Sequence, residues 1–360
     1  MSDLLKNIAK QRQEIKSDRM DMSFGEIINM YKDGEILISP EYQRAFRWDV
    51  QRETDFIESV LLGIPFPSIF VATNDDGTWE LIDGLQRVST ILSFFGELKN
   101  SERNNLCLCE GSIIKELSGI TIETLPLELK LAIKRTPCRV EIIQKESNFE
   151  MRYELFKRLN TGGEGLTRQE IRNCIYRGAT NYKVFSDMLK RLANNQDFVK
   201  SVYISTVQQQ EMMYEELVLR FFALYKYRDN YTQKTIQDFF DTVMKQQSDN
   251  PDLGAIESFE AIFEKVFAFF GQYDENINLF RLARLNFSTS MYDALCLSLA
   301  DYDGDIASIN KGAFISAVEE LKADEDFKRH AGAASSTASN IREKIRIAKA
   351  KLFNGRIEAV

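Results

Sequence analysis

The chain of 360 residues is 44% hydrophobic and 28% charged, with a net charge of −8 at pH 7, which is typical of a soluble protein of about two domains. No apolar run approaches the ~20 residues of a membrane span, and the charged N-terminus has no signal-peptide core, so we expect a cytoplasmic protein without membrane contact. The single histidine, His330, excludes HNH nucleases, HD phosphohydrolases and HExxH proteases, and leaves a Ser-His-Asp triad without a nucleophile signature.

The N-terminal half predicts a mixture of helices and strands. Asp49 is suited to cap a helix that Gly63 ends, and two apolar segments joined by Asn-Asp-Asp-Gly predict a β-hairpin. Cys107 and Cys109 would share one face of a strand, and the five cysteines are expected to be reduced core thiols because none forms a CxxC pair. Further helices are expected at 1–20, 22–31 and 123–134, and strands at 35–38, 68–73, 78–83, 106–109 and 138–144.

The pattern becomes helical from residue 147 onwards. Helical spacing of apolar residues is expected at 210–229, 232–246, 257–271, 289–300, 312–322 and 340–353, with a small-residue loop at 332–339. The sequence therefore predicts an α+β fold, in which a small mixed-sheet domain at 1–178 precedes an all-α domain at 179–360.

The segment LIDGLQRVST, 81–90, runs from a predicted strand into a predicted helix. Asp83 as N-cap with Gln86 three residues later would form a capping-box-like start, which explains the segment by structure alone. The same geometry presents free backbone N–H groups and the positive end of the helix dipole to an anion. Arg87 would then add a forked cation for phosphate, and Gly84 would allow close approach. From this segment alone the structural interpretation is the commoner one.

Two more segments place arginines beside aromatic residues or beside a glycine-containing turn. SPEYQRAFRWDV, 39–50, suits either a surface loop pinned by its aromatics or a clamp that stacks on a base and holds phosphates. RLNTGGEGLTRQEIRN, 158–173, contains a capping box of Thr167 and Glu170. Its Asn-Thr-Gly-Gly turn offers a nest of N–H groups, but it lacks the Walker Gly-Lys-Ser/Thr, and no P-loop occurs in the chain.

The segment IREKIRIAKAK, 341–351, is strongly basic, with five cations and one glutamate. A basic helix of this kind suits DNA binding. Apolar residues also recur through it at helical spacing, so we expect it to pack partly against its own domain.

In chain order, PxYQRxFxW, LLGIPxPxIF, IDGxQRxxT and RLNTGGxxLTxQEIRN resemble the DGQQR-motif family, over about residues 38–178. That family supplies the N-terminal, GmrS-like part of GmrSD-type modification-dependent restriction enzymes. Its core is similar to the ParB/sulfiredoxin-like fold, whose strand-to-helix turn binds nucleotide phosphates. The resemblance thus implies a ParB/sulfiredoxin-like domain at 1–178 with a nucleotide site.

The resemblance also implies particular site residues and a cofactor, which is an NTP with Mg²⁺. No residue of the protein is expected to be a metal ligand. Leu85 stands where the family motif has Gln and sulfiredoxin its reactive Cys, which excludes sulfiredoxin chemistry and predicts either poor hydrolysis or a core role for Leu85. The implied catalytic residues are Asp83, Gln86 and Arg87, and the implied nucleotide-binding residues are Tyr42, Gln43, Arg44, Trp48, Gly84, Arg87, Asn160, Thr161, Gly162, Gly163 and Arg172.

The leading hypothesis is a nucleotide-binding protein, in its stronger form an NTPase, that acts as sensor or regulator in a phage-defence or modification-dependent restriction system. Fused family members carry an HNH half, which one histidine cannot supply, so the resemblance implies either a stand-alone sensor or a sensor whose partner is a separate nuclease subunit. A homodimer is also open. The first alternative is a module that binds modified DNA without hydrolysis. A nuclease with an Asp/Glu metal site and an antitoxin-like scaffold rank below it.

Overall fold

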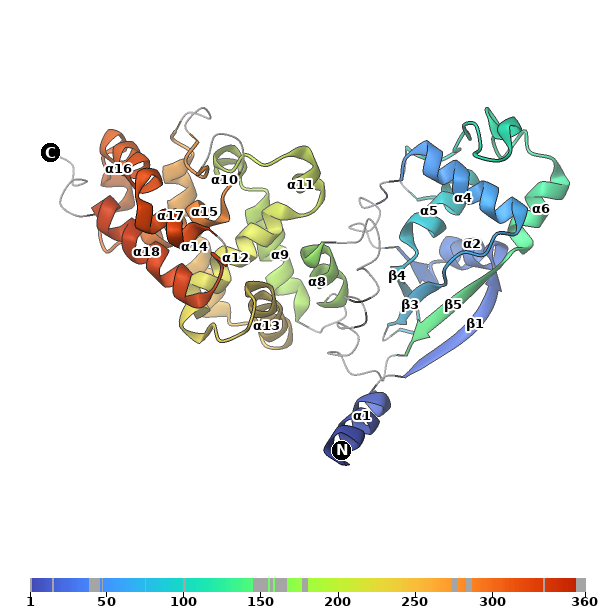
Figure 1. The fold of residues 1–360 in the computed structure, drawn as a ribbon, viewed down its shortest axis with the longest axis horizontal. Coiled ribbons are helices and arrows are strands. Elements are labelled where there is room, and N and C mark those ends of the chain that lie inside the picture. The colour runs from blue at the N-terminus through green and yellow to red at the C-terminus, as the bar shows by residue number, and fades with distance from the viewer. Residues whose placement is uncertain are drawn as a thin grey trace. The chain divides into compact units, whose positions relative to one another are not determined.

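The computed structural model describes residues 1–360 except 1, 15, 39–45, 47, 75, 100–101, 145–154, 156–157, 159–166, 177–180, 274–277, 283–286, 333 and 354–360. The chain divides into two compact units, residues 1–178 and 179–360, and each is described by itself (Figure 1). The first unit contains all the strands of the mixed sheet and the second is helical, which confirms the predicted α+β class. No helix among the described residues is long and apolar enough to cross a membrane.

A five-stranded mixed sheet runs through the first unit in the order β1-β5-β3-β4-β2. The predicted hairpin is confirmed as the antiparallel pair of β3 and β4, while β3 and β5 are parallel. The strands are β1 (Ser17–Ser23), β2 (Ile36–Leu37), β3 (Ile69–Thr73), β4 (Trp79–Asp83) and β5 (Pro137–Ile143).

The predicted helix over residues 1–20 is wrong at its C-terminal end. Helix α1 spans Ser2–Glu14, and β1 then pairs antiparallel with β5. β1 is a largely exposed edge strand, so its sequence lacks the apolar alternation that marks a half-buried strand. Asp21 and Arg139 lie opposite each other in this pair of strands. Their ion pair, with 3.0 Å between Arg139 Nε and Asp21 Oδ1, supports the pairing.

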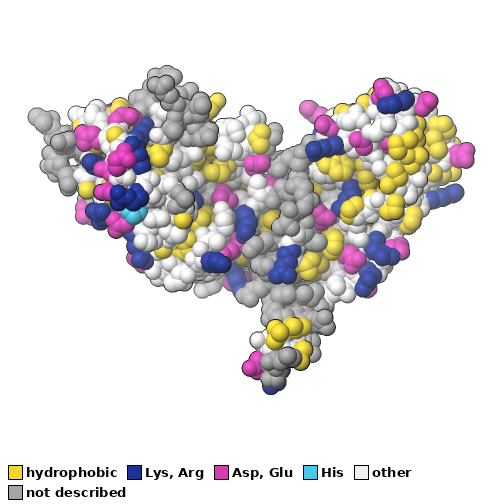
Figure 2. Space-filling model, viewed as in Figure 1, with side chains coloured by type: hydrophobic (Ala, Val, Ile, Leu, Met, Phe, Trp, Pro, Cys, Tyr) yellow, Lys and Arg dark blue, Asp and Glu magenta, His cyan; other side chains and the backbone are white. Residues whose placement is uncertain are grey.

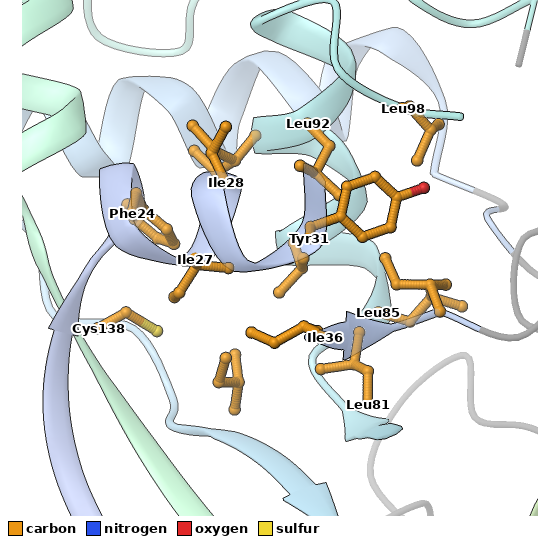
Figure 3. Packing of buried hydrophobic residues seen from close by; sticks show 14 of the residues in the cluster. Phe24, Ile27, Ile28, Tyr31, Ile36, Leu81, Leu85, Leu92, Leu98 and Cys138 are labelled. Carbon is orange, nitrogen blue, oxygen red and sulfur yellow. The ribbon is translucent and has the colours of Figure 1, made fainter. Parts of the chain in front are cut away.

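Helices cover the sheet of the first unit, and their core is shown in Figure 3. Helix α2 begins after the N-cap Ser23, and Ile27 points from it toward Cys138 of β5 and Ile36 of β2. Tyr31, one turn further, lies beside Leu92. Besides α1, the helices that the structure describes in this unit are α2 (Phe24–Asp33), α4 (Val50–Leu62), α5 (Leu85–Phe94), η1 (Lys115–Leu117), α6 (Leu127–Arg135) and α8 (Arg168–Tyr176).

The strand predicted at 106–109 does not form. Leu106 and Leu108 are buried as the alternation requires, but Leu108 exchanges its backbone hydrogen bonds with Ile120 and Gly119 of a nearby turn rather than with a strand. Cys107 is consequently exposed, so its prediction as a core thiol is wrong, whereas Cys138 and Cys296 are buried. Each cysteine whose side chain is described is free of a disulfide.

The second unit packs its helices around a core of phenylalanines. Phe259, Phe263 and Phe267 recur at one-turn spacing on α14, are fully buried, and lie ring to ring. The predicted helix 289–300 is confirmed in full as α15, whereas 210–229 is divided at Met212, whose φ of 59° interrupts the helix. The helices are α9 (Tyr182–Ala193), α10 (Gln196–Ser201), α11 (Thr206–Gln210), α12 (Met213–Tyr227), η2 (Arg228–Asn230), α13 (Ile236–Asp249), α14 (Leu253–Phe270), α15 (Thr289–Ala300), η3 (Ile306–Ser308), α16 (Lys311–Ala323), α17 (Glu325–Ala331) and α18 (Ala338–Phe353).

A buried charged cluster connects three of these helices. Arg220 of α12 donates to both carboxylate oxygens of Asp293 on α15, at 2.5 and 2.7 Å. Lys344 of α18 lies 3.5 Å from the same carboxylate and 3.1 Å from the Ser290 hydroxyl. All three charged side chains are at most 5% exposed, so two cations share one anion inside the unit.

Candidate functional site

The turn between β4 and α5 is the centre of the candidate site. Gly84 is the N-cap of α5, with φ 92° and ψ 13°, and no side chain caps the helix among the described residues. The interpretation of Asp83 as N-cap with Gln86 in a capping box is therefore wrong. Gly84 has no side chain to accept from the first turn of α5, and backbone N–H groups at a helix start of this kind favour an anion.

Asp83 instead pairs with Arg87, one helical turn further on. The Asp83 Oδ2 to Arg87 Nη2 distance is 2.9 Å, and Arg87 Nη1 also donates to the Pro67 carbonyl. The side chain of Arg87 is 12% exposed and that of Asp83 is 31% exposed. The pair thus ties the end of β4 to the connector that enters β3, with the carboxylate near the surface.

The second predicted segment reaches this turn at its C-terminal end. The backbone N–H of Trp48 donates to Gln86 Oε1 at 3.1 Å. Arg103 holds the same segment by donating to the carbonyls of Phe46 and Trp48, and its guanidinium lies 3.9 Å from the Phe46 ring centroid. The structure therefore brings Trp48 and Gln86 together, while Tyr42, Gln43 and Arg44 lie outside the described residues.

The third predicted segment is described only in part. The capping box of Thr167 and Glu170 is confirmed. The Thr167 N–H donates to the Glu170 carboxylate at 2.7 Å, and the Glu170 N–H donates to the Thr167 hydroxyl at 3.3 Å. Arg172 is fully buried and donates to Gln169 of its own helix at 3.1 Å. Asn160, Thr161, Gly162 and Gly163 lie outside the described residues, so their predicted contact with phosphate stays a prediction.

Glu53 is a buried carboxyl beside the site that the sequence analysis missed. It lies in the first turn of α4, is 1% exposed, and accepts from Arg103 Nη2 at 3.2 Å. Burial raises its pKa to about 7, against the opposing effect of Arg103. The signal was present, since Glu53 shares helical spacing with the apolar Ile57 and Val60 on the buried face of α4.

Residues 24–177 match the family model described as GmrSD restriction endonuclease, N-terminal domain. This segment is similar to a GmrSD N-terminal domain, and we call it the GmrSD-type domain. The predicted resemblance is thereby confirmed for this segment, and it relates the chain to restriction systems. No curated protein and no solved structure matches the chain.

The motif of this GmrSD-type domain departs from the family pattern at Leu85. Its side chain is 7% exposed and lies beside Leu81 in the core (Figure 3). The expected core role of Leu85 is confirmed. The position therefore offers no polar group to a ligand, and the side chains next to it, Gln86 and Arg87, are the ones that reach the site.

Protonation of Glu53 couples the stability of the GmrSD-type domain to pH. A carboxyl with pKa 4.5 when unfolded and about 7 when folded binds its proton more tightly in the native state. Its contribution is largest below pH 4.5 and is lost as pH rises through 7, by about 3 kcal/mol. We expect Glu53→Gln to remove this slope, measured by urea unfolding between pH 5 and 8 with tryptophan fluorescence.

The fluorescence reports this domain because both tryptophans, Trp48 and Trp79, lie in it. Glu110→Gln, at an exposed carboxyl, is the matched control and should retain the wild-type slope. An unchanged slope in Glu53→Gln would contradict the assignment of the titration to Glu53.

The described residues offer no protein-built metal centre. No group of three or more His, Cys, Asp or Glu side chains is placed to hold a metal ion in the part of the chain that the structure describes. A metal that arrives with its ligand needs no such group, since Mg²⁺ commonly keeps several waters and is held through substrate phosphates.

Proposed function

We propose that the GmrSD-type domain binds a nucleoside triphosphate, with its Mg²⁺, at the β4–α5 turn and acts as the sensor of a restriction-type phage-defence system. The observation that carries this proposal is the uncapped start of α5 beside Trp48, whose N–H is bonded to Gln86. It combines an anion-binding helix terminus with an aromatic side chain on an adjacent segment.

The phosphates would lie against the first turn of α5. Its backbone N–H groups and the helix dipole together favour a negative group at this end. Gln86 Oε1 accepts from the Trp48 N–H, which fixes the Gln86 side chain at the first turn of α5. The backbone N–H groups of this turn would then be the donors to phosphate, with no rearrangement of the backbone.

Arg87 would serve as the cation of this site. A guanidinium has five N–H donors, of which the Asp83 carboxylate and the Pro67 carbonyl engage Nη2 and Nη1. A phosphate that approaches the turn would compete with Asp83, whose carboxylate carries the same sign of charge and is partly exposed. Asp83 therefore acts as an internal substitute for the ligand in the free protein.

Trp48 is placed to contact the base or sugar. Its ring packs edge-on against Phe56 of α4, with centroids 5.9 Å apart, and its side chain is only half-buried. The ring is thereby held by the core and keeps an accessible part, which we propose contacts a planar ligand. Tyr42, Gln43 and Arg44, which precede it in the chain, are proposed to complete this part of the site.

We propose nucleotide binding as the primary activity. Hydrolysis of the nucleotide is the stronger form of this proposal, and Leu85, which is apolar and buried, has no polar group to contribute to it. The nucleotide would bring Mg²⁺, which neutralises phosphate charge when bound. The nuclease activity of such a system would reside in a separate subunit, which the nucleotide-bound domain would regulate. A homodimer is compatible with this arrangement.

The proposal predicts opposite effects for the two members of the Asp83–Arg87 pair. Titration calorimetry of the full chain with ATP, GTP, CTP and UTP, with and without Mg²⁺, should detect binding of at least one nucleotide. We expect Arg87→Gln to weaken it about tenfold or more, because charge-assisted contacts to phosphate are lost. Asp83→Asn should retain or strengthen binding, because it removes the competing carboxylate.

Arg139→Gln is the matched control, since it breaks an exposed ion pair of the same unit away from the turn. Thermal melting of each variant shows that it is folded. Absence of binding by any nucleotide, or equal loss in Arg87→Gln and Arg139→Gln, would overturn the proposal. Phosphate release in the same samples separates a binder from an NTPase.

The alternative of a DNA-binding module stays a prediction, and α18 supports it less directly than its sequence does. Of the five cations of α18, Lys344 is buried, Arg346 pairs with Glu343, Lys349 with Asp301 and Lys351 with Asp324, while Arg342 is exposed. On the face shown in Figure 2, basic side chains of the second unit lie among acidic ones. The expected packing of this helix is confirmed, because Ile341, Ile345, Ala348 and Leu352 are buried.

A further inference from the structure

The second unit contains a cavity of about 320 Å³ that the site on the first unit does not use. Its walls come from the end of α10, from α12, from the end of α14 and from the segment that leads into α15. This volume lies at the lower end of the range for small-molecule sites, about 300–1,000 Å³. All described lining residues belong to residues 199–287, so the cavity is a feature of one unit.

Aromatic rings dominate the lining. The buried floor is provided by Phe270, Phe280 and Tyr273, and the more open positions by Tyr203, Tyr214 and Phe287. Tyr203 is 73% exposed, which is a high exposure for an aromatic side chain. Such a lining favours a flat, unsaturated ring, which can stack on or meet the edges of these side chains.

The charged side chains of the lining are both cations. Arg281 lies over the exposed Tyr203 ring, with 5.5 Å between its guanidinium carbon and the ring centroid. Lys200 is exposed and donates to the Gly271 carbonyl at 3.2 Å, which leaves two ammonium donors. No Asp or Glu is among the described residues that line the cavity, although the chain as a whole has a charge of −8. The Asp197 carboxylate lies beside Gly271, where an added Cβ would be 2.4 Å from its Oδ1, so the attraction of an anion rests on Arg281 and Lys200 themselves.

The cavity wall also contains a buried polar group without a partner. The Tyr273 side chain is 6% exposed, and its hydroxyl has no hydrogen-bond partner among the described residues. An unpaired buried hydroxyl costs about 1–3 kcal/mol. The hydroxyl is buried behind the ring, so the tyrosine contributes its ring to the cavity wall.

We propose that this cavity binds a nucleotide unit, with the planar base among the aromatic rings and the phosphate at Lys200 and Arg281. The inference is independent of the site at the β4–α5 turn, because it uses different residues on a different unit. The ligand can be a free mononucleotide or a nucleotide of a single strand, since both present a base next to a phosphate.

The test uses the full chain and four nucleoside 5′-monophosphates, with the matching nucleosides and inorganic phosphate as half-ligands. We expect at least one monophosphate to bind, and to bind more tightly than its nucleoside or phosphate. Arg281→Gln and Lys200→Gln should each weaken it about tenfold. Short single-stranded oligonucleotides form the second arm, and tighter binding of these than of the monophosphate identifies a strand as the source.

Arg342→Gln removes an exposed cation of the same unit outside the cavity and should leave binding unchanged. Tyr273→Phe removes only the buried, unpartnered hydroxyl, so it should retain binding of the monophosphate and raise the melting temperature of the free protein. Arg87→Gln should leave this binding intact, which separates the two sites. Failure of every probe to bind, or equal binding by wild type, Arg281→Gln and Lys200→Gln, would overturn the proposal.

Discussion

Replacing Asp293 by Asn is expected to destabilise the second unit by about 3–5 kcal/mol, because it removes the buried carboxylate that Arg220 and Lys344 share. The substitution preserves the volume of the side chain, so no cavity contributes. Arg220 would lose two short charge-assisted hydrogen bonds to the carboxylate. Urea unfolding followed by far-UV circular dichroism is the appropriate measurement, since the second unit is helical throughout.

Lys344→Met provides the contrast within the same cluster. Burial lowers the pKa of Lys344, and the nearby Asp293 carboxylate offsets part of this effect. The Lys344 Nζ lies 3.5 Å from Asp293 Oδ2, which is further than either contact of Arg220 with Asp293. Replacing it with an apolar side chain of similar length should change stability by no more than about 1.5 kcal/mol. If Lys344→Met proved as harmful as Asp293→Asn, the Arg220–Asp293 pair would not be the dominant contact.

The double variant Asp293→Asn/Lys344→Met completes the cycle. One buried cation is removed together with the anion, so the loss should be smaller than the sum of the two single losses. Additive losses would show that Lys344 and Asp293 do not interact energetically in the native state.

Local patterns predicted those parts of the fold that neighbouring residues decide. The β3–β4 hairpin follows from a turn sequence between two apolar segments, and the capping box of α8 follows from Thr167 and Glu170 at the required spacing. The packing of α18 also followed from its periodicity, which places Ile341 and Ile345 on the buried face.

Tertiary contacts decided the rest. β1 is a polar edge strand that only pairing with β5 explains. Asp83 has the residue type and the place of an N-cap, but Arg87 competes for its carboxylate, and Gly84 becomes the cap. Lys344 was counted among the cations of a basic helix expected to pack only in part, because the sequence does not show that Asp293, 51 residues away, shares its site.

The candidate site also has a part that the sequence predicted and a part that only the structure shows. The sequence predicted that the 81–90 segment forms a strand-to-helix turn, and the match of residues 24–177 confirms the family. It did not show that Gln86 accepts from Trp48 across 38 residues, or that Arg103 and Glu53 lie behind this contact. Such contacts depend on how α4 and α5 pack, which no single motif encodes.

Gly84→Ala is expected to destabilise the first unit by about 3 kcal/mol. Its φ of 92° lies in the left-handed region, which costs an L-residue about 1–2 kcal/mol. An added Cβ would also lie 2.5 Å from Cγ2 and 3.0 Å from Cβ of Ile69, a fully buried residue of β3, and such overpacking typically costs about 1–3 kcal/mol. Urea unfolding followed by tryptophan fluorescence measures the loss.

Gly34→Ala separates these two terms. Gly34 ends α2 with a φ of 80°, and nothing lies within 4 Å of an added Cβ, so only the backbone strain of about 1–2 kcal/mol should appear. The difference between the two variants then measures the contact with Ile69. Equal losses would show that β3 moves aside at no cost, and that close packing against Ile69 is not what requires glycine in this turn.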